Sequence, residues 1–229
     1  MSSAKHIFSF SVLCILTWVL KRVEYSMKNI AVLASGRGTN LQAIIENTES
    51  GTLRANLACV ISDREDAKAL ERARQHNIKA IYLDPGPKKT WLIPEVEQKY
   101  VQTLKDHNID LVCLAGFMRI LKKPLLDAFT GRIINIHPSL LPAFPGLDVQ
   151  KKAIDWGVKF SGCTVHFVDE GVDTGPIILQ KAVKVGEQDT EETLSSRILK
   201  EEHFLYSQAI TLYFENKLKL DGRRVIILS

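Results

Sequence analysis

The sequence predicts an α/β fold in which an open, mostly parallel β-sheet carries helices on both faces. Short apolar runs rich in β-branched residues alternate with amphipathic helical segments from Asn29 to Ile136. These runs are apolar at nearly every position, which is typical of strands covered on both faces. The strand–helix–strand order favours right-handed crossovers between parallel strands. Together these three observations indicate a Rossmann-like sheet.

The alternating part of the chain contains five expected strands and four expected helices. The strands are Ile30–Ala34, Leu57–Ser62, Ala80–Leu83, Leu111–Ala115 and Ile133–Ile136. The helices lie near Asn40–Asn47, Glu65–His76, Pro94–His107 and Lys123–Phe129. Ligands of open α/β sheets bind at the carboxyl ends of the strands, so a site is expected in the loops that follow them.

The rhythm changes after Gly146, where the expected strands become longer. Two of them are joined by the turn-rich segment DEGVDTGP, and a long helix with one apolar face follows. The last residues, KLKLDGRRVIILS, predict a β-hairpin. The expected elements are the helix Val149–Trp156, the strands Lys159–Val168 and Gly175–Val185, the helix Glu191–Phe214 and a turn at Asp221–Gly222.

The length and composition of the chain are those of an ordinary globular protein. The 229 residues are 45% hydrophobic and 24% charged, which fits one domain or two small ones. The net charge of +4 is spread along the chain, so the basic stripe of a nucleic-acid-binding protein is not predicted. The four cysteines form no C-x-x-C pair, which favours free thiols of a reducing cytoplasm and argues against zinc.

The first 26 residues are expected to lie outside the catalytic domain. Phe8–Leu20 is an apolar run of 13 residues, whereas a membrane-spanning helix needs about 20. No cleavage site of small residues follows it, and Met27 stands directly before the first strand. We therefore expect Met27 to be the real start of the protein, with residues 1–26 as an N-terminal extension outside a single catalytic domain at 27–229. A targeting or anchor segment, or an extra helix, are the alternatives.

The loop after the first strand is a candidate phosphate site. It reads SGRGTN, and its two glycines, Gly36 and Gly38, allow a sharp turn directly before a helix. The amino end of that helix offers free N–H groups and a positive dipole to an anion. The loop lacks both the third glycine of a dinucleotide fingerprint and the Gly-Lys-Ser/Thr of a Walker A loop. A simple tight turn is the alternative.

The strand that ends NIHP carries the strongest chemical signal. Residues two apart on a strand face the same side, so Asn135 and His137 can point at one small volume. The prolines at 138, 142 and 145 stiffen the loop that follows. An amide and an imidazole placed in this way can stabilise an oxyanion, and the imidazole can also transfer protons. A structural histidine at a strand end is the alternative.

Asp173, in the DEGVDTGP turn, is the candidate partner of His137. A carboxylate within hydrogen-bonding reach favours the imidazolium and is expected to raise the pKa of His137. A turn residue that bonds its own backbone is the alternative. His166, in the run SGCTVHFV, is expected to line the site and to support the catalytic residues; a direct catalytic role is the alternative.

Four motifs in order, GRGTNLQAII, LAGFMRIL, NIHPSLLPAFPG and DEGVDTGPIILQ, resemble the folate-dependent glycinamide ribonucleotide formyltransferase family from about Met27 to the final helix. The resemblance implies the formyltransferase fold and transfer of the formyl group of 10-formyltetrahydrofolate to the substrate amine in purine synthesis. It also implies a cytoplasmic monomer or homodimer that handles small molecules, with no metal, nucleic acid or membrane partner.

The resemblance also assigns roles to individual residues. It implies a cis peptide at Leu141–Pro142 and the catalytic residues Asn135, His137 and Asp173. The implied contacts of the nucleotide phosphate and ribose are Gly38, Thr39, Asn40 and Glu202. The implied folate contacts are Met118, Arg119, Ile120, Leu121, Asn135, Asp169, Glu170, Gly171 and Val172.

The chain departs from the family pattern at one position, and two enzymes with related activities resemble it as well. Some family members carry an arginine that reaches the folate tail, but GPKKTWLIPEVEQ has none, so Lys88 or Lys89 is the expected substitute. Formyltetrahydrofolate hydrolase is similar but carries an extra amino-terminal regulatory module. Methionyl-tRNA formyltransferase is similar too, but adds a carboxyl-terminal domain and lacks the GRGTN-type loop. A silent nucleotide-binding protein is a further alternative, which the complete catalytic trio disfavours.

Overall fold

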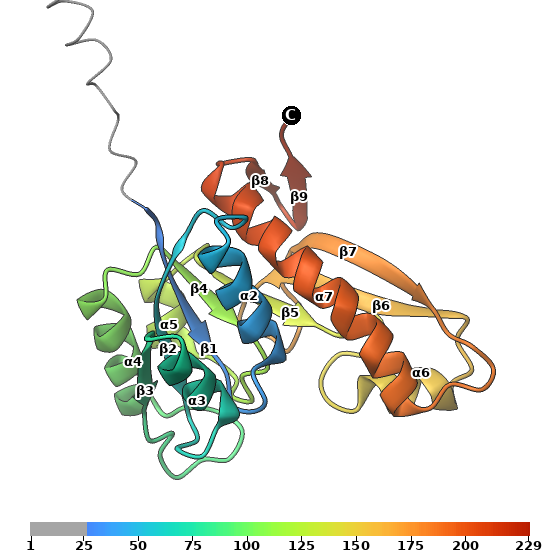
Figure 1. Cartoon of the computed structure of the whole chain (residues 1–229), viewed down its shortest axis with the longest axis horizontal. Helices are drawn as coiled ribbons and strands as arrows, with labels where there is room; N and C mark the ends of the chain where they lie inside the picture. Colours follow the sequence, from blue (N-terminus) through green and yellow to red (C-terminus); the bar gives the residue numbers. More distant parts are fainter. Residues whose placement is uncertain (1–26) are drawn as a thin grey trace, which may run out of the picture.

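The computed structural model describes residues 27–229. The expectations for the extension at 1–26, Cys14 included, lie outside these residues. Within them, the strands form one sheet in the order β3-β2-β1-β4-β5-β6-β7-β9-β8 (Figure 1). The first five strands in this order are parallel, as the sequence predicts.

Helices and strands alternate along the chain as expected. The strands are β1 (Asn29–Leu33), β2 (Asn56–Ser62), β3 (Lys79–Tyr82), β4 (Leu111–Leu114), β5 (Ile133–His137), β6 (Phe160–Phe167), β7 (Ile177–Lys184), β8 (Leu218–Asp221) and β9 (Arg224–Ile227). The helices are α2 (Thr39–Glu49), α3 (Lys68–Gln75), α4 (Pro94–Asp106), α5 (Lys123–Ala128), α6 (Val149–Asp155) and α7 (Glu191–Phe214).

Helix α3 begins three residues later than the sequence analysis expected. The Arg64 guanidinium binds the Asp66 carboxylate at 2.9 Å, and the Arg64 N–H bonds the Ser62 hydroxyl at 3.1 Å. These local bonds hold residues 64–66 in a turn, so the expected start of the helix at Glu65 is wrong. A short polar side chain that bonds the nearby backbone, as Ser62 does here, competes with helix formation.

The carboxyl-terminal half of the sheet is partly antiparallel. Strand β6 runs antiparallel to both β5 and β7, and a connection without a helix joins β6 to β7. The register places Asn135 opposite His166 and His137 opposite Thr164. The β8–β9 hairpin turns at Gly222, as predicted, and joins β7 through a pairing of Ile177 with Arg224.

Helices cover both faces of the sheet, as predicted. On one face, α2, α3 and α7 pack on side chains such as Ile30 and Val32, and α7 lies across β6 and β7 in Figure 1. On the other face, α4 and α5 pack on Ala31 and Leu33. Adjacent residues of β1 thus enter different cores, which explains why the strand is apolar throughout.

The cysteines of the described chain are buried free thiols, and burial raises the pKa of Cys59 and of Cys163 to about 12. None of the helices in the described part of the chain is long and apolar enough to cross a membrane.

Candidate active site

A cavity of about 470 Å³ opens at the carboxyl ends of β1, β4 and β5. Its walls come from segments far apart in the chain: the loop after β4, the end of β5 with the loop that follows it, and the β6–β7 connection. Asn40 of α2, Glu202 of α7, His166 of β6 and Thr90 also line it. The cavity therefore lies where an open α/β sheet is expected to bind its ligand.

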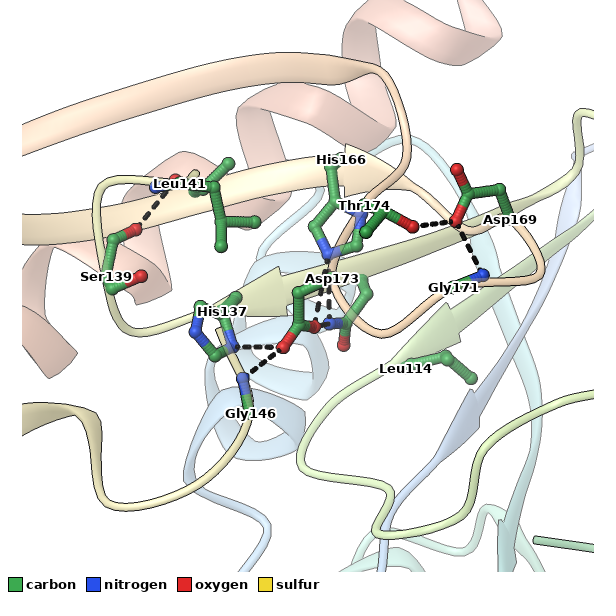
Figure 2. Close-up of polar contacts among 12 residues, drawn as sticks. Leu114, His137, Ser139, Leu141, Gly146, His166, Asp169, Gly171, Asp173 and Thr174 are labelled. Atoms are coloured by element: carbon green, nitrogen blue, oxygen red, sulfur yellow. Dashed lines mark hydrogen bonds and ion pairs between the residues drawn. The ribbon is translucent and has the colours of Figure 1, made fainter. Parts of the chain in front are cut away.

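The candidate catalytic residues meet in this cavity, as their spacing predicts. Asn135 and His137 stand two residues apart on β5 and therefore face the same side, and the Asp173 carboxylate contacts both side chains. Figure 2 shows Asp173 beside His137. The Asp173 Oδ2 atom is 3.3 Å from His137 Nδ1, and its Oδ1 atom accepts a hydrogen bond of 3.3 Å from Asn135 Nδ2. An amide, an imidazole and a carboxylate thus share one small volume.

The backbone of the β6–β7 connection aims the Asp173 carboxylate. Asp173 adopts a left-handed conformation (φ 54°), which aspartate tolerates better than most residues. Its Oδ2 atom also accepts a 2.8 Å hydrogen bond from the Gly146 N–H, which fixes the carboxylate in place. Asp169 holds the same connection by accepting bonds from the Gly171 N–H and the Thr174 hydroxyl (Figure 2).

The His137 ring lies between two hydrogen-bond acceptors. Its Nε2 atom is 2.9 Å from the Phe144 carbonyl oxygen, while Nδ1 faces Asp173. A neutral imidazole has a single N–H and can satisfy only one of the two acceptors. The pocket therefore gives the imidazolium two hydrogen-bond partners.

Burial nevertheless prevails over these partners in the free protein. Burial lowers the pKa of His137 below its usual 6.5, although Asp173 and the Phe144 carbonyl act in the opposite direction. Asp173 thus acts in the expected direction, but burial outweighs it, because the His137 ring is only 6% exposed and loses its hydration. Burial also raises the pKa of Asp173, but His166, His137 and the Gly146 N–H outweigh burial and bring this pKa below its usual 3.8. At neutral pH, Asp173 is ionised and His137 is mainly neutral.

The protonation of His137 can be tested by titration. We expect NMR of the labelled imidazole to give a pKa below 6.5 for His137 in the free protein, and a still lower value in D173N. The second change has this sign because the Asp173 charge stabilises the imidazolium, and D173N removes it. The lowered pKa of His137 also makes the stability of the fold depend on pH. Its effect on the free energy of unfolding is fully present above the usual 6.5 and is lost as the pH falls through the lower folded-state pKa. A pKa above 6.5, or a rise in D173N, would contradict this picture.

His166 orients the Asn135 amide, in agreement with its expected supporting role. Its Nδ1 atom contacts the Phe167 carbonyl oxygen at 2.7 Å, so Nδ1 carries the proton and Nε2 is left as an acceptor. Nε2 lies 3.2 Å from Asn135 Nδ2 and 3.7 Å from Asp173 Oδ1. The buried ring therefore fixes which end of the amide faces the trio.

The loop after β5 is held by residues that the sequence analysis missed. The Thr164 hydroxyl donates to the Ser139 carbonyl at 2.7 Å, and Gln180 Nε2 donates to the Leu141 carbonyl at 2.8 Å. The Leu141–Pro142 bond is cis, as the resemblance implies. This loop supplies the Phe144 carbonyl and the Gly146 N–H, so its anchoring positions the trio.

The segment after β4 forms one wall of the cavity with its backbone. The Met118 N–H bonds the Ser35 hydroxyl and the Ile120 N–H bonds the Thr90 carbonyl, both at 2.8 Å. Within residues 27–229 the N–H groups of Arg119 and Leu121 have no such partner.

The Arg119 side chain has a structural role in addition to its place in this wall. Its Nε atom donates to the buried Asp63 carboxylate at 2.6 Å, and Nη1 donates to the Lys88 carbonyl at 2.7 Å. The guanidinium thus ties the wall to β2 and to the segment before α4. Thr90 of that segment lines the cavity, whereas the Lys88 and Lys89 side chains do not.

Asn40 and Glu202 form the other end of the cavity. Asn40 Nδ2 donates to Glu202 Oε2 at 2.9 Å. Burial raises the pKa of Glu202, and the bond from Asn40 opposes that rise. Gly38 and Thr39 stand at the start of α2 beside this pair and do not line the cavity themselves. Of the residues expected on the far side, Asp169, Gly171 and Val172 line the cavity, and the exposed Glu170 does not.

The chain is similar in sequence and in fold to known proteins. Residues 28–210 match the Formyl transferase family model. Glycinamide ribonucleotide transformylase 1 from Symbiobacterium toebii is 52% identical, with a TM-score of 0.85 over 89% of this chain and 95% of that structure. Phosphoribosylglycinamide formyltransferase of Bacillus subtilis is 46% identical over 80% of this chain and 93% of its own length.

A much longer relative also matches. The trifunctional purine biosynthetic protein adenosine-3 of Drosophila melanogaster is 45% identical over 84% of this chain, which spans 14% of that protein's length. The family match covers most of the described residues, and the solved relative shares the fold over nearly its whole length. The chain therefore belongs to the formyl transferase family.

Proposed function

We propose that this chain transfers the formyl group of 10-formyltetrahydrofolate to the amine of N1-(5-phospho-D-ribosyl)glycinamide. The products are the N2-formyl compound and tetrahydrofolate, and the reaction belongs to purine (IMP) biosynthesis. The observation that carries the proposal is the meeting of Asn135, His137 and Asp173 in the cavity. Membership of the formyl transferase family supports it.

The wall formed by residues 118–121 suits the pteridine ring of the folate. A pteridine is flat and carries hydrogen-bond donors and acceptors along its edge, which the backbone groups of Arg119 and Leu121 can meet. Met118 and Val172 are 53% and 45% exposed and offer apolar contacts to the rings. Ile120, Asp169 and Gly171 belong to the same walls. Contacts of Glu170, and of Lys88 or Lys89 with the folate tail, remain predictions.

The opposite end of the cavity suits the ribonucleotide. Gly38, Thr39 and Asn40 place the amino end of α2 where it can bind the phosphate. The buried Glu202 carboxylate, oriented by Asn40, can accept hydrogen bonds from the ribose hydroxyls. The amine of a nucleotide bound in this way would extend toward Asn135 and His137.

The geometry suggests how the trio promotes the reaction. The neutral substrate amine attacks the formyl carbon, a new C–N bond forms, and the carbonyl oxygen becomes negative. Asn135 and protonated His137 stabilise this oxyanion. The negative charge of the oxyanion raises the pKa of His137, which burial lowers in the free protein. Asp173 stabilises the imidazolium. The C–N10 bond then breaks, and the amine proton passes to N10 through water held by Asp173 or His137.

We further place this activity in the cytoplasm, on a monomer or homodimer that binds small molecules rather than nucleic acid. The buried thiols Cys59, Cys113 and Cys163 suit a reducing compartment.

An acceptor assay tests the proposed function. The purified chain is given 10-formyltetrahydrofolate with glycinamide ribonucleotide, with water alone, or with aminoacylated initiator tRNA. We expect release of tetrahydrofolate to depend on glycinamide ribonucleotide and the N2-formyl product to match it mole for mole. Release of tetrahydrofolate in water alone would indicate a formyltetrahydrofolate hydrolase. Formylation of the tRNA would indicate a methionyl-tRNA formyltransferase.

A further inference from the structure

Helix α3 holds the loop that leads into α2. Arg72, on α3, donates from Nε to the Arg37 carbonyl oxygen and from Nη1 to the Gln42 side-chain oxygen, both at 2.9 Å. These acceptors lie on either side of Gly38, one in the loop and one in the first turns of α2. A single guanidinium therefore fixes the loop relative to the helix it precedes.

The loop and α3 are also packed closely. The Ala69 N–H donates to the Gly36 carbonyl oxygen at 3.1 Å. Gly38 has a φ of +68°, and a Cβ atom there would lie 2.9 Å from the Ala69 Cα atom. The fully buried Ala69 leaves no room for that atom to be accommodated. Only glycine fits this position without displacing α3.

These bonds determine the direction of the loop's N–H groups. The carbonyls of Gly36 and Arg37 both point at α3, where Ala69 and Arg72 bind them. In a trans peptide the N–H points opposite to the carbonyl of the same peptide unit, so the Arg37 and Gly38 N–H groups point away from α3. Neither has a hydrogen-bond partner within residues 27–229. Successive free N–H groups before a helix form an anion-binding concavity.

We infer that Arg72 is a positioning residue for the phosphate of the nucleotide. It acts through the loop: by holding the Arg37 carbonyl and Gln42, it directs backbone N–H groups at the phosphate. This inference rests on the proposed function, because it takes the phosphate to bind at residues 37–40. It extends that function by identifying which residue outside the cavity controls selectivity for a phosphorylated acceptor.

The test compares two acceptors and three variants. R72M removes both hydrogen bonds and keeps the aliphatic stem, and R72K restores a donor for one of them. Arg74, exposed on the same helix, gives the matched control R74M, which removes an equal charge. Each variant is assayed with glycinamide ribonucleotide and with its dephosphorylated riboside.

We expect R72M to lower kcat/KM for the ribonucleotide about tenfold, mainly through KM, and to change kcat/KM for the riboside less than about twofold. R72K should recover part of the loss, and R74M should resemble the wild type. Equal losses on both acceptors, or R72M behaviour identical to that of R74M, would overturn the inference. If R72M fails to fold, R72K decides by the same ratio of acceptors.

The same assay separates this inference from the proposed function. A wild-type chain that formylates neither acceptor, or that uses both equally well, contradicts the proposed function or its phosphate site. A wild type that strongly prefers the ribonucleotide, together with an R72M variant that keeps this preference, contradicts only the role of Arg72.

Discussion

The D173N variant is expected to lower kcat for formyl transfer about 100-fold or more. Asparagine fills the same space but carries no charge, so the oxyanion is stabilised by an imidazole that is less readily protonated. Its amide can also present an N–H toward His137 Nδ1 or the Gly146 N–H, where Asp173 is an acceptor only. The loss corresponds to about 3 kcal/mol of transition-state stabilisation.

Steady-state kinetics with saturating folate and nucleotide measure this effect. Because Asp173 acts on the reacting centre, kcat should fall far more than KM rises. The exposed Asp155, which pairs with Lys151 on α6, gives the matched control D155N, expected to keep wild-type kcat. Wild-type turnover in D173N would remove Asp173 from the mechanism.

The H137A variant is expected to reduce kcat by a similar factor, about 100-fold or more. Alanine removes the imidazole whose positive charge stabilises the oxyanion and frees Asp173 from one of its partners. The fold should persist, because β5 keeps its pairing with β4 and β6 and the Asp173 carboxylate keeps its bond from Gly146.

Rapid-quench measurement of product formation separates this loss from slower product release. His107, which contacts the Thr103 carbonyl of its own helix, gives the control H107A. If H137A forms product in a single turnover as fast as the wild type, the imidazole takes no part in the chemical step.

Local pattern was sufficient to predict most elements of the fold. The apolar runs located β1, β2, β4 and β5 to within a residue or two, because each strand buries both faces. The start of α3 was not predictable in this way. There the Ser62 hydroxyl bonds the Arg64 N–H, and residues 65–66 form a turn before the helix begins.

The site was predictable where it depends on spacing and not where it depends on distant contacts. The two-residue separation of Asn135 and His137 is enough to place them on one side of β5. The pKa of His137 depends instead on how deeply the folded chain buries the ring, which no local pattern reveals. The engagement of Arg119 with Asp63, 56 residues earlier in the chain, is equally invisible in sequence.

Some supporting residues carried a signal that could have been read. Ser35 opens the SGRGTN motif directly after the first strand, and its hydroxyl accepts a hydrogen bond from the Met118 N–H in the loop after β4. Gln180 and Thr164 stand on expected strands, but their bonds to the loop after β5 require the antiparallel register of β6 with its neighbours.

The rate of the D173N/H137A double variant tests most directly whether the carboxylate and the imidazole serve one developing negative charge. Residues that act as a unit lose their effect together, so we predict a kcat within about tenfold of the slower single variant. If instead the two losses multiply, to about 10,000-fold, the two side chains act independently and the mechanism proposed for this cavity is wrong.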